Sequence, residues 1–249
     1  MEYKTIYMKN ILACAWLLLP AGSYAAAAQD ALPTSDAYAV LEAYIEAIGG
    51  REAIERIENR VTRGTLKLGE FTASITLYQR LPDHYRMVQV FDFGEVDQGY
   101  DGEQGWRTIP GEGRAPVTGE ELEDQRFQFS IRQPLVLDEV YSVSAQSEVR
   151  MEEGRSLNVL EFTAHSGPQE WFFDAETHLL ERIEADVQMG SGETVKVETA
   201  LGDWRDVDGV LIPHRMHSRV GDTEVQLEYA SVVHNQTLID DDFAPGGRP

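Results

Sequence analysis

The sequence predicts an α+β fold in which an N-terminal helix precedes one long antiparallel sheet, and a second helix interrupts the sheet in mid-chain. Three observations predict this fold. Apolar residues recur at helical spacing between Ala37 and Ile48. From Val61 onward, runs of alternating apolar and polar residues are separated by turn signals at short, regular intervals, which is typical of antiparallel connections. Near residue 120, helical spacing returns for a short stretch.

The first predicted helix spans residues 37–48 and begins at a cap formed by Ser35 or Asp36. Gly49 and Gly50 end it, because glycine readily takes the left-handed conformation found at helix ends. A second short helix is expected over residues 51–57. The apolar face of the first helix consists of Val40, Leu41, Tyr44, Ile45 and Ile48.

Residues 71–81 form the clearest predicted strand, with Phe71, Ala73, Ile75 and Leu77 on one face. Pro82 and Asp83 then turn the chain. The next run, residues 85–93, carries apolar side chains on both faces. This second strand is therefore expected to be covered on both sides.

The mid-chain helix follows the segment Thr118-Gly119-Glu120-Glu121, which has the spacing of a capping box. Residues 110–116 before it are rich in glycine and proline and are expected to be a mobile approach. Two interpretations stay open. The helix is either a plain connector between two halves of the sheet or a lid that moves on this approach.

The composition favours one globular domain with an acidic surface. The chain has 249 residues, of which 42% are hydrophobic, and 43 acidic against 21 basic residues give a formal charge of -22. We expect a single domain over residues 37–249. Such a charge makes nucleic acid an unexpected partner and repels anionic bilayers, so any contact with lipid has to run through an apolar pocket.

Residues 1–28 are predicted to be a cleaved secretory signal peptide, followed by a polar leader at 29–36. Cleavage after Ala25 or after Ala28 fits, and Ala28 is preferred. Cys14 is the only cysteine and lies in the signal, so the mature chain is expected to lack disulfides and to be a soluble protein of a bacterial periplasm. An alternative, in which residues 11–14 form a lipobox, is disfavoured because few apolar residues precede Cys14.

The residues give no strong catalytic or metal-binding motif. His214 and His217 are three residues apart, which places them on opposite faces of a strand. The run from Asp206 to Gly209 lacks the remaining ligands of a calcium loop, and residues 240–242 are expected to be a solvated acidic segment. We therefore predict no enzyme activity, metal or cofactor, although a pair of carboxylates that meet in space stays open.

Several segments, in this order, resemble the periplasmic lipoprotein-carrier superfamily, which comprises the Lol-type chaperones and their outer membrane lipoprotein-sorting relatives. Residues 44–53 look like the opening helix of those relatives, and residues 204–213 look like their penultimate hairpin. The shared sequence features also include R-L-P-D at 80–83, D-G-x-x-x-W at 101–106 and F-D-A-E-T at 173–177. Together they extend over most of residues 37–249.

The resemblance implies a strongly curved, incomplete antiparallel β-barrel, or half-barrel, whose concave face is covered by the N-terminal and mid-chain helices. It also implies an apolar cavity for acyl chains. In the carriers, an arginine shortly before a proline ties the lid shut, and Arg80 is the matching position. A plain surface arginine is the alternative for Arg80. The longer insertions and the more acidic surface depart from the carriers and leave the cargo open.

Ten residues are predicted to line the cavity, although ordinary core packing would explain each of them as well. They are Phe71, Ile75, Leu77, Met87, Phe91, Trp106, Leu160, Phe162, Trp171 and Phe173. The predicted function is that of a periplasmic carrier or sensor of a lipid or a lipidated protein, which shields acyl chains in an apolar cavity for transit to the outer membrane. The protein is expected to be a monomer, with envelope transport machinery as a further partner. The alternatives are a non-catalytic interaction module of an envelope complex and a carboxylate-dependent hydrolase.

Overall fold

The computed structural model describes residues 35–137, 142–164, 167–188 and 194–247. The predicted signal peptide and almost all of the leader lie outside these ranges. The helical elements are α2 (Ser35–Ala47), α3 (Arg51–Glu55), α4 (Glu120–Gln128), η1 (Gln133–Val136) and η2 (Asp240–Phe243). The strands are β1 (Asn59–Leu68), β2 (Phe71–Arg80), β3 (His84–Phe91), β4 (Gly94–Tyr100), β5 (Gly105–Ile109), β6 (Gly113–Val117), β7 (Ser142–Glu152), β8 (Arg155–Ala164), β9 (Gly167–Asp174), β10 (Leu180–Gln188), β11 (Thr194–Val207), β12 (Val210–Val220) and β13 (Thr223–His234).

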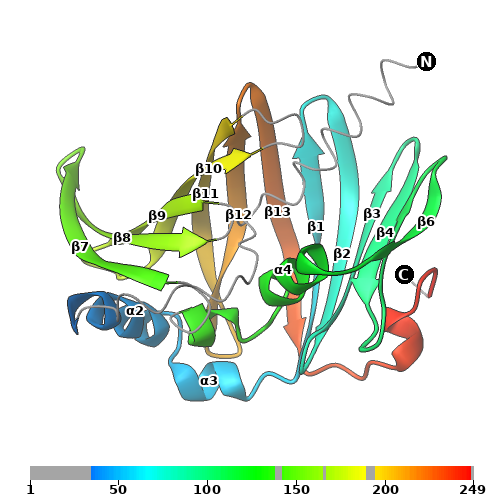
Figure 1. Ribbon diagram of the computed structural model, residues 1–249. Helices are drawn as coiled ribbons and strands as arrows, with labels where there is room; N and C mark the ends of the chain where they lie inside the picture. The colour runs from blue at the N-terminus through cyan, green and yellow to red at the C-terminus, as the bar shows by residue number, and fades with distance from the viewer. Residues whose placement is uncertain (1–34, 138–141, 165–166, 189–193, 248–249) are drawn as a thin grey trace.

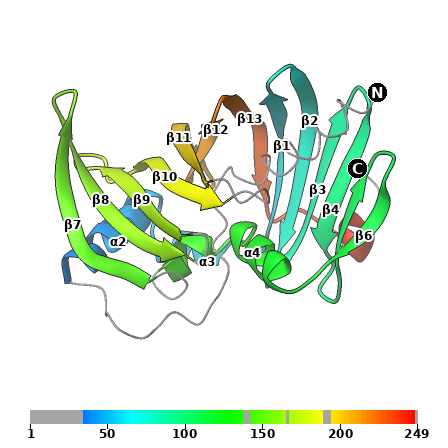
Figure 2. The same ribbon diagram turned by 45° about the horizontal axis from the view of Figure 1, so that its top comes forward.

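These strands form one 13-stranded sheet in the order β6-β5-β4-β3-β2-β1-β13-β12-β11-β10-β9-β8-β7. Each strand pairs antiparallel with its neighbours, and pairing of the first strand with the last joins the two halves of the sheet. The sheet bends around a concave side and stays open, with β6 and β7 as its two edges (Figures 1 and 2). The predicted open antiparallel sheet is confirmed.

A β-bulge in β13 adapts this strand to its partner β1: Arg63 pairs with Ser231 and Gly64 with Tyr229, so Ala230 is the extra residue. The register shifts between Arg63 and Gly64. A Cβ atom at Gly64 would lie 2.2 Å from the carbonyl oxygen of Glu228, so only glycine lets the two backbones approach this closely. Strand β13 therefore changes its phase here, with Val225 and Leu227 buried before the bulge and Val232 and His234 after it. Strand β1 keeps one phase, and its Arg60, Thr62 and Leu66 all line the concave side.

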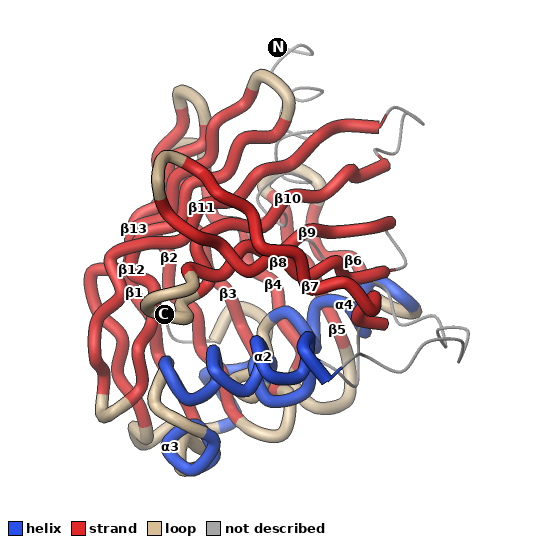
Figure 3. Tube along the Cα trace, turned by 90° about the vertical axis from the view of Figure 1, so that its left-hand side faces the viewer, coloured by secondary structure: helices blue, strands red, loops and turns tan. Residues whose placement is uncertain are grey.

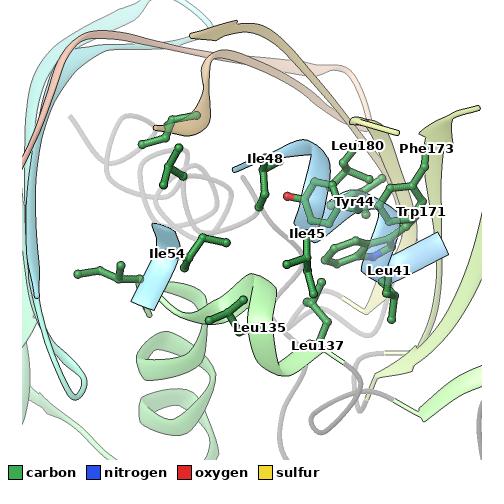
Figure 4. Close-up of a cluster of buried hydrophobic side chains, with 14 of the residues drawn as sticks. Leu41, Tyr44, Ile45, Ile48, Ile54, Leu135, Leu137, Trp171, Phe173 and Leu180 are labelled. Atoms are coloured by element: carbon green, nitrogen blue, oxygen red, sulfur yellow. The ribbon is translucent and has the colours of Figure 1, made fainter. Parts of the chain in front are cut away.

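The largest core cluster joins the N-terminal helices to the strands of one half of the sheet (Figure 4). Helix α2 contacts β7, and the ring of Tyr44 lies 5.4 Å from that of Phe173 on β9. Helices α2 and α3 lie at one end of the strands (Figures 1 and 3). Among the described residues, no helix combines the length and the apolar composition that crossing a membrane requires.

The structure corrects the predicted cap of the mid-chain helix. Helix α4 begins at Glu120, and Gly119, at a φ of 63°, occupies its N-cap position without a side-chain hydrogen bond. Thr118 therefore lies one residue too early for a capping box. The acidic residues Glu120, Glu121 and Glu123 in the first turn favour this start instead, through the positive end of the helix dipole.

Two sequence segments that are far apart meet at the end of α2. The main-chain N–H of Leu211 donates a 2.9 Å hydrogen bond to the carbonyl of Ile48. Gly49 has a φ of 123°, and a Cβ atom there would lie 2.2 Å from the carbonyl oxygen of Gly209. Glycine at this position therefore both ends the helix and allows contact with the β11–β12 turn.

The C-terminal segment packs against the start of β3 on the outer face of the sheet, where Arg86 contacts the main chain of Asp242. The expected cover on both sides of β3 holds only in part, because Val88 is buried on this face whereas Val90 is 46% exposed. Phe243 on η2 is 1% exposed and packs against Val61 and Tyr78. Asp240 is 95% exposed, as expected for the acidic segment, whereas the phenylalanine three residues later anchors the segment to the sheet.

Candidate ligand-binding cavity

A cavity of about 190 Å³ lies between the concave side of the sheet and the helical segments, and it is partly open to solvent. Strands β1, β2, β3, β11, β12 and β13 form its long wall, and residues 128–134 close it from the side of α4. Most of the wall is apolar. The apolar lining residues include Leu66, Ile75, Leu77, Met87, Ile131, Trp171, Leu201, Trp204, Met216 and Leu227.

Four of the ten residues predicted for the cavity line it, namely Ile75, Leu77, Met87 and Trp171. Three others, Leu160, Phe162 and Phe173, belong to the core cluster beneath α2. The ring of Phe162 lies 4.7 Å from that of Trp171. In this half of the sheet, helix α2 fills the space in front of the strands.

The remaining three predicted residues, Phe71, Phe91 and Trp106, are not among those that line the cavity. Phe71 and Phe91 belong to a second core cluster, where both rings contact Phe93 at centroid distances of 5.6 Å and 4.8 Å. Trp106 is 3% exposed and lies directly over Gly99, at which a Cβ atom would be 2.7 Å from the indole ring. Whether any of the ten binds a ligand stays a prediction.

Arg80, the predicted latch, contacts the C-terminal segment in this structure. Its guanidinium lies 2.9 Å from the Asp240 carboxylate and stacks 4.5 Å from the centre of the Phe243 ring. Because side chains alternate along a strand, its neighbour Gln79 points to the concave side. There Gln79 Nε2 donates a 2.6 Å hydrogen bond to the main-chain carbonyl of Phe129. The latch role of Arg80 stays a prediction.

Three further contacts hold α4 against β2 and β3. The Tyr85 hydroxyl donates to the Gln125 side chain, and the Tyr85 ring stacks on that of Phe129 at 4.6 Å. Arg126 Nε donates a 2.8 Å hydrogen bond to the Asp83 carboxylate. Burial, and next the nearby charge of Glu121, raise the pKa of the Tyr85 hydroxyl well above its ordinary value. Tyr85 therefore stays protonated and can keep donating to α4.

Polar groups gather where β1, β2 and β13 meet on the cavity wall. Arg60 is paired in register with Gln79 on one side and with His234 on the other. Arg60 Nε donates a 3.1 Å hydrogen bond to His234 Nε2. Burial lowers the pKa of Arg60 to about 10, so that the guanidinium stays positively charged at neutral pH.

His234 and Tyr229 are the uncharged members of this group. Burial, and next the charge of Arg60, lower the pKa of His234 from 6.5 to about 4, so that its Nε2 is a hydrogen-bond acceptor at neutral pH. Its Nδ1 lies 3.4 Å from the Asp208 carboxylate. Burial raises the pKa of the Tyr229 hydroxyl from 10.0 to about 12.

The positions of these polar lining residues in the sequence indicate that they face the cavity, although only apolar residues were predicted to line it. Gln79 and Gln89 follow Leu77 and Met87 by two residues, and side chains two apart on a strand share a face. A polar residue in phase with an apolar face is a candidate for a polar contact inside a cavity. Among the described residues, no group of three or more His, Cys, Asp or Glu is placed to hold a metal ion.

Comparison with known proteins relates the fold to solved structures. No protein-family model matches the sequence, and no curated protein matches it. The chain is similar to a LolA superfamily protein from Nitrosomonas europaea, with 12% identity and a TM-score of 0.55 over 84% of this chain and 98% of that one. It is also similar to an outer membrane lipoprotein-sorting protein domain from Vibrio parahaemolyticus, with 13% identity and a TM-score of 0.55 over 82% of this chain and 95% of that one. These likenesses show that the chain has the Lol-type fold.

Proposed function

We propose that this protein is a periplasmic carrier that shields the acyl chain of a lipid or lipidated protein during transit to the outer membrane. The observation that carries the proposal is the mostly apolar cavity between the concave side of the sheet and the segment that follows α4. The Lol-type fold supports the same function. The predicted signal peptide supports a location in the periplasm.

The energetics of an acyl chain explain why such a cavity is needed. Each methylene withdrawn from water gains about 0.8 kcal/mol, so a chain of roughly 14 to 16 carbons resists exposure by about 11 to 13 kcal/mol. A flat surface leaves much of such a chain in water. An enclosed apolar site removes most of it, which is the requirement for crossing an aqueous compartment.

The size of the cavity implies that α4 moves when cargo binds. Its volume of about 190 Å³ is below the roughly 300–1,000 Å³ of typical small-molecule sites. Polar contacts of Gln79, Tyr85 and Arg126 hold α4 in place, together with Phe127, which is buried in the core cluster. A neutral hydrogen bond contributes about 1 kcal/mol and a charged one roughly 1.5–3 kcal/mol, so the burial of a long acyl chain can offset an outward movement of α4.

The alternatives from the sequence have less support. A hydrolase needs carboxylates or other reactive groups in a cleft, and among the described residues the cavity wall contains no aspartate, glutamate or histidine. An interaction module that docks through a sheet edge has no need of a cavity. A binding role for the cavity is therefore the function that we favour.

The test is saturable uptake of a fluorescent fatty acid by the purified, lipid-free protein. A Leu77→Trp substitution adds bulk to the cavity wall, and we expect it to weaken uptake about tenfold or more, a change of about 1.4 kcal/mol. Ser74→Trp places the same side chain on the exposed face of the same strand and is the matched control. Uptake that is absent in the wild type, or equal in the wild type and both variants, would contradict the proposal.

A further inference from the structure

Arg60 is a positively charged side chain on the wall of an otherwise mostly apolar cavity. Among the residues that the structure describes, no carboxylate lies within 4.0 Å of its guanidinium, and its hydrogen bond goes to a neutral imidazole, that of His234. Arg60 is half-buried, and a charge that is partly removed from water without a counter-charge is costly unless an ion of opposite sign joins it. The position therefore favours an anion.

The geometry of the guanidinium leaves donors for such an anion. Its Nε is occupied by His234, whereas the terminal nitrogens carry further N–H donors. These terminal groups form the fork that binds carboxylates and phosphates through two parallel hydrogen bonds. His234 acts here as a positioning residue, because its Nε2 accepts from Arg60 and its Nδ1 lies 3.4 Å from Asp208.

The surroundings of Arg60 define what else the ligand carries. Gln79 is its cross-strand neighbour and lines the same wall. Further along β1 and β2, beyond Thr62 and Leu77, the lining residues are apolar and include Leu66 and Ile75. A polar end next to a continuous apolar wall fits an amphiphile with an anionic head group and one hydrocarbon chain.

We propose that Arg60 binds the anionic head group, a carboxylate or a phosphate, of a single-chain amphiphile whose acyl chain lies along the apolar wall. This inference rests on the proposed carrier function and specifies its ligand. A head group at Arg60 also lies beside the contact between Gln79 and α4. Binding of the head group and release of α4 therefore involve adjacent residues.

The test compares three probes with the same hydrocarbon chain at neutral pH: palmitate, hexadecyl phosphate and hexadecanol. Each displaces a fluorescent fatty alcohol from the purified, lipid-free protein, which gives its Kd. We expect at least one anionic probe to bind the wild type about tenfold or more tightly than hexadecanol. The carboxylate and phosphate arms distinguish a fatty acid from a phosphorylated lipid.

The substitution Arg60→Gln should abolish this preference and leave the Kd of hexadecanol within about twofold, because only the charge is removed. Arg60→Lys, which retains a charge, should keep part of the preference. The matched control is Arg63→Gln, which removes the same charge from an exposed position of the same strand and should change nothing. Thermal melting of each variant confirms that it is folded.

The possible failures are distinguishable. If hexadecanol and both anionic probes bind the wild type equally, the head-group inference is overturned while the carrier function stands. The same holds if Arg63→Gln reduces the preference as much as Arg60→Gln, because the effect then comes from net charge. If none of the probes and no fluorescent lipid binds, the carrier function itself fails. The comparison of the three probes on the wild type tests the head-group inference even where a variant does not fold.

Discussion

Gln79 on β2 donates a 2.6 Å hydrogen bond to the main-chain carbonyl of Phe129, the residue at the C-terminal end of α4. The bond links a strand of the concave wall to the helical segment that closes the cavity. It is a contact of the kind that the family resemblance leads us to expect from Arg80, the next residue in the chain, whose own latch role stays a prediction. The opposite direction of the two side chains follows from strand alternation.

Substitution of Gln79 by leucine should loosen α4. The change removes the donor and leaves the Phe129 carbonyl without its partner, which costs about 1–3 kcal/mol. We expect hydrogen exchange of peptides covering residues 120–133 to become faster, while peptides from β11 to β13 stay unchanged. Gln89→Leu is the control, since Gln89 lines the same cavity from β3 and its hydrogen bond goes to Met87. Equal exchange in the two variants would show that Gln79 does not hold the helix.

The buried ion pair between Arg86 and Asp97 should be essential for attachment of the C-terminal segment. The two side chains are 1% and 5% exposed, and the main-chain N–H of Gly246 donates to the same carboxylate at 2.9 Å. Asp97→Ala leaves a buried positive charge and should lower the free energy of unfolding by about 3–5 kcal/mol.

Urea unfolding measures this loss, and limited proteolysis after residue 236 reports release of the segment. The double variant Arg86→Met/Asp97→Leu removes both charges and should recover much of the stability of the wild type. A double variant as unstable as the sum of its single substitutions would mean that the pairing of the charges is not the cause.

His234 should make the protein less stable at acidic pH. Its folded pKa of about 4 lies below the 6.5 of the unfolded chain, so between these values the unfolded chain binds more protons and stability falls as the pH falls. The charged groups around the imidazole are Arg60, which disfavours protonation, and Asp208, which favours it. Over the whole window the loss amounts to at most about 3 kcal/mol.

Urea unfolding of the wild type and of His234→Gln at pH 7 and near pH 4.5 isolates this contribution. The wild type should lose about 2–3 kcal/mol more than the variant between the two conditions. An equal loss in both proteins would assign the acid sensitivity to the carboxylates instead.

Gly49 should not tolerate a side chain. Alanine there meets the carbonyl oxygen of Gly209 at 2.2 Å and must adopt a φ of 123°, so we expect a loss of roughly 3 kcal/mol or more in the free energy of unfolding. Gly202→Ala is the control, because the space around Gly202 is open and its φ is not in the left-handed region. Thermal melting compares the two, and a similar melting temperature for both would refute the role of the contact between α2 and the β11–β12 turn.

The strands and the first helix could be predicted because their signals are local. Strand β2 was predicted over residues 71–81 and spans Phe71–Arg80, with Ala73, Ile75 and Leu77 on the buried face. The first helix was predicted over residues 37–48 and spans Ser35–Ala47, so Ser35 belongs to the helix rather than to its cap. The alternation of apolar and polar residues along a strand, and their helical spacing along a helix, indicate which side of the element is covered.

The candidate site could be predicted only in part. Ile75, Leu77, Met87 and Trp171 line the cavity, whereas Leu160 and Phe173 are equally apolar and inward-facing but are covered by α2. Periodicity identifies the face of a strand and does not tell whether another element fills the space in front of it. That depends on where α2 and α4 lie on the sheet.

The sequence by itself determined the first helix, the faces of the longer strands and the glycine stop after the first helix, because each depends on neighbouring residues. It did not determine the stretch 110–116, which was expected to be a mobile approach and instead forms most of the edge strand β6 through pairing with β5. Only the tertiary structure decided which distant groups meet. Arg60 and His234 are 174 residues apart and touch because β1 pairs with β13, and Phe243 contacts His84 because the C-terminal segment returns to the sheet. Such contacts follow from long-range strand pairing and packing, which local sequence patterns do not predict.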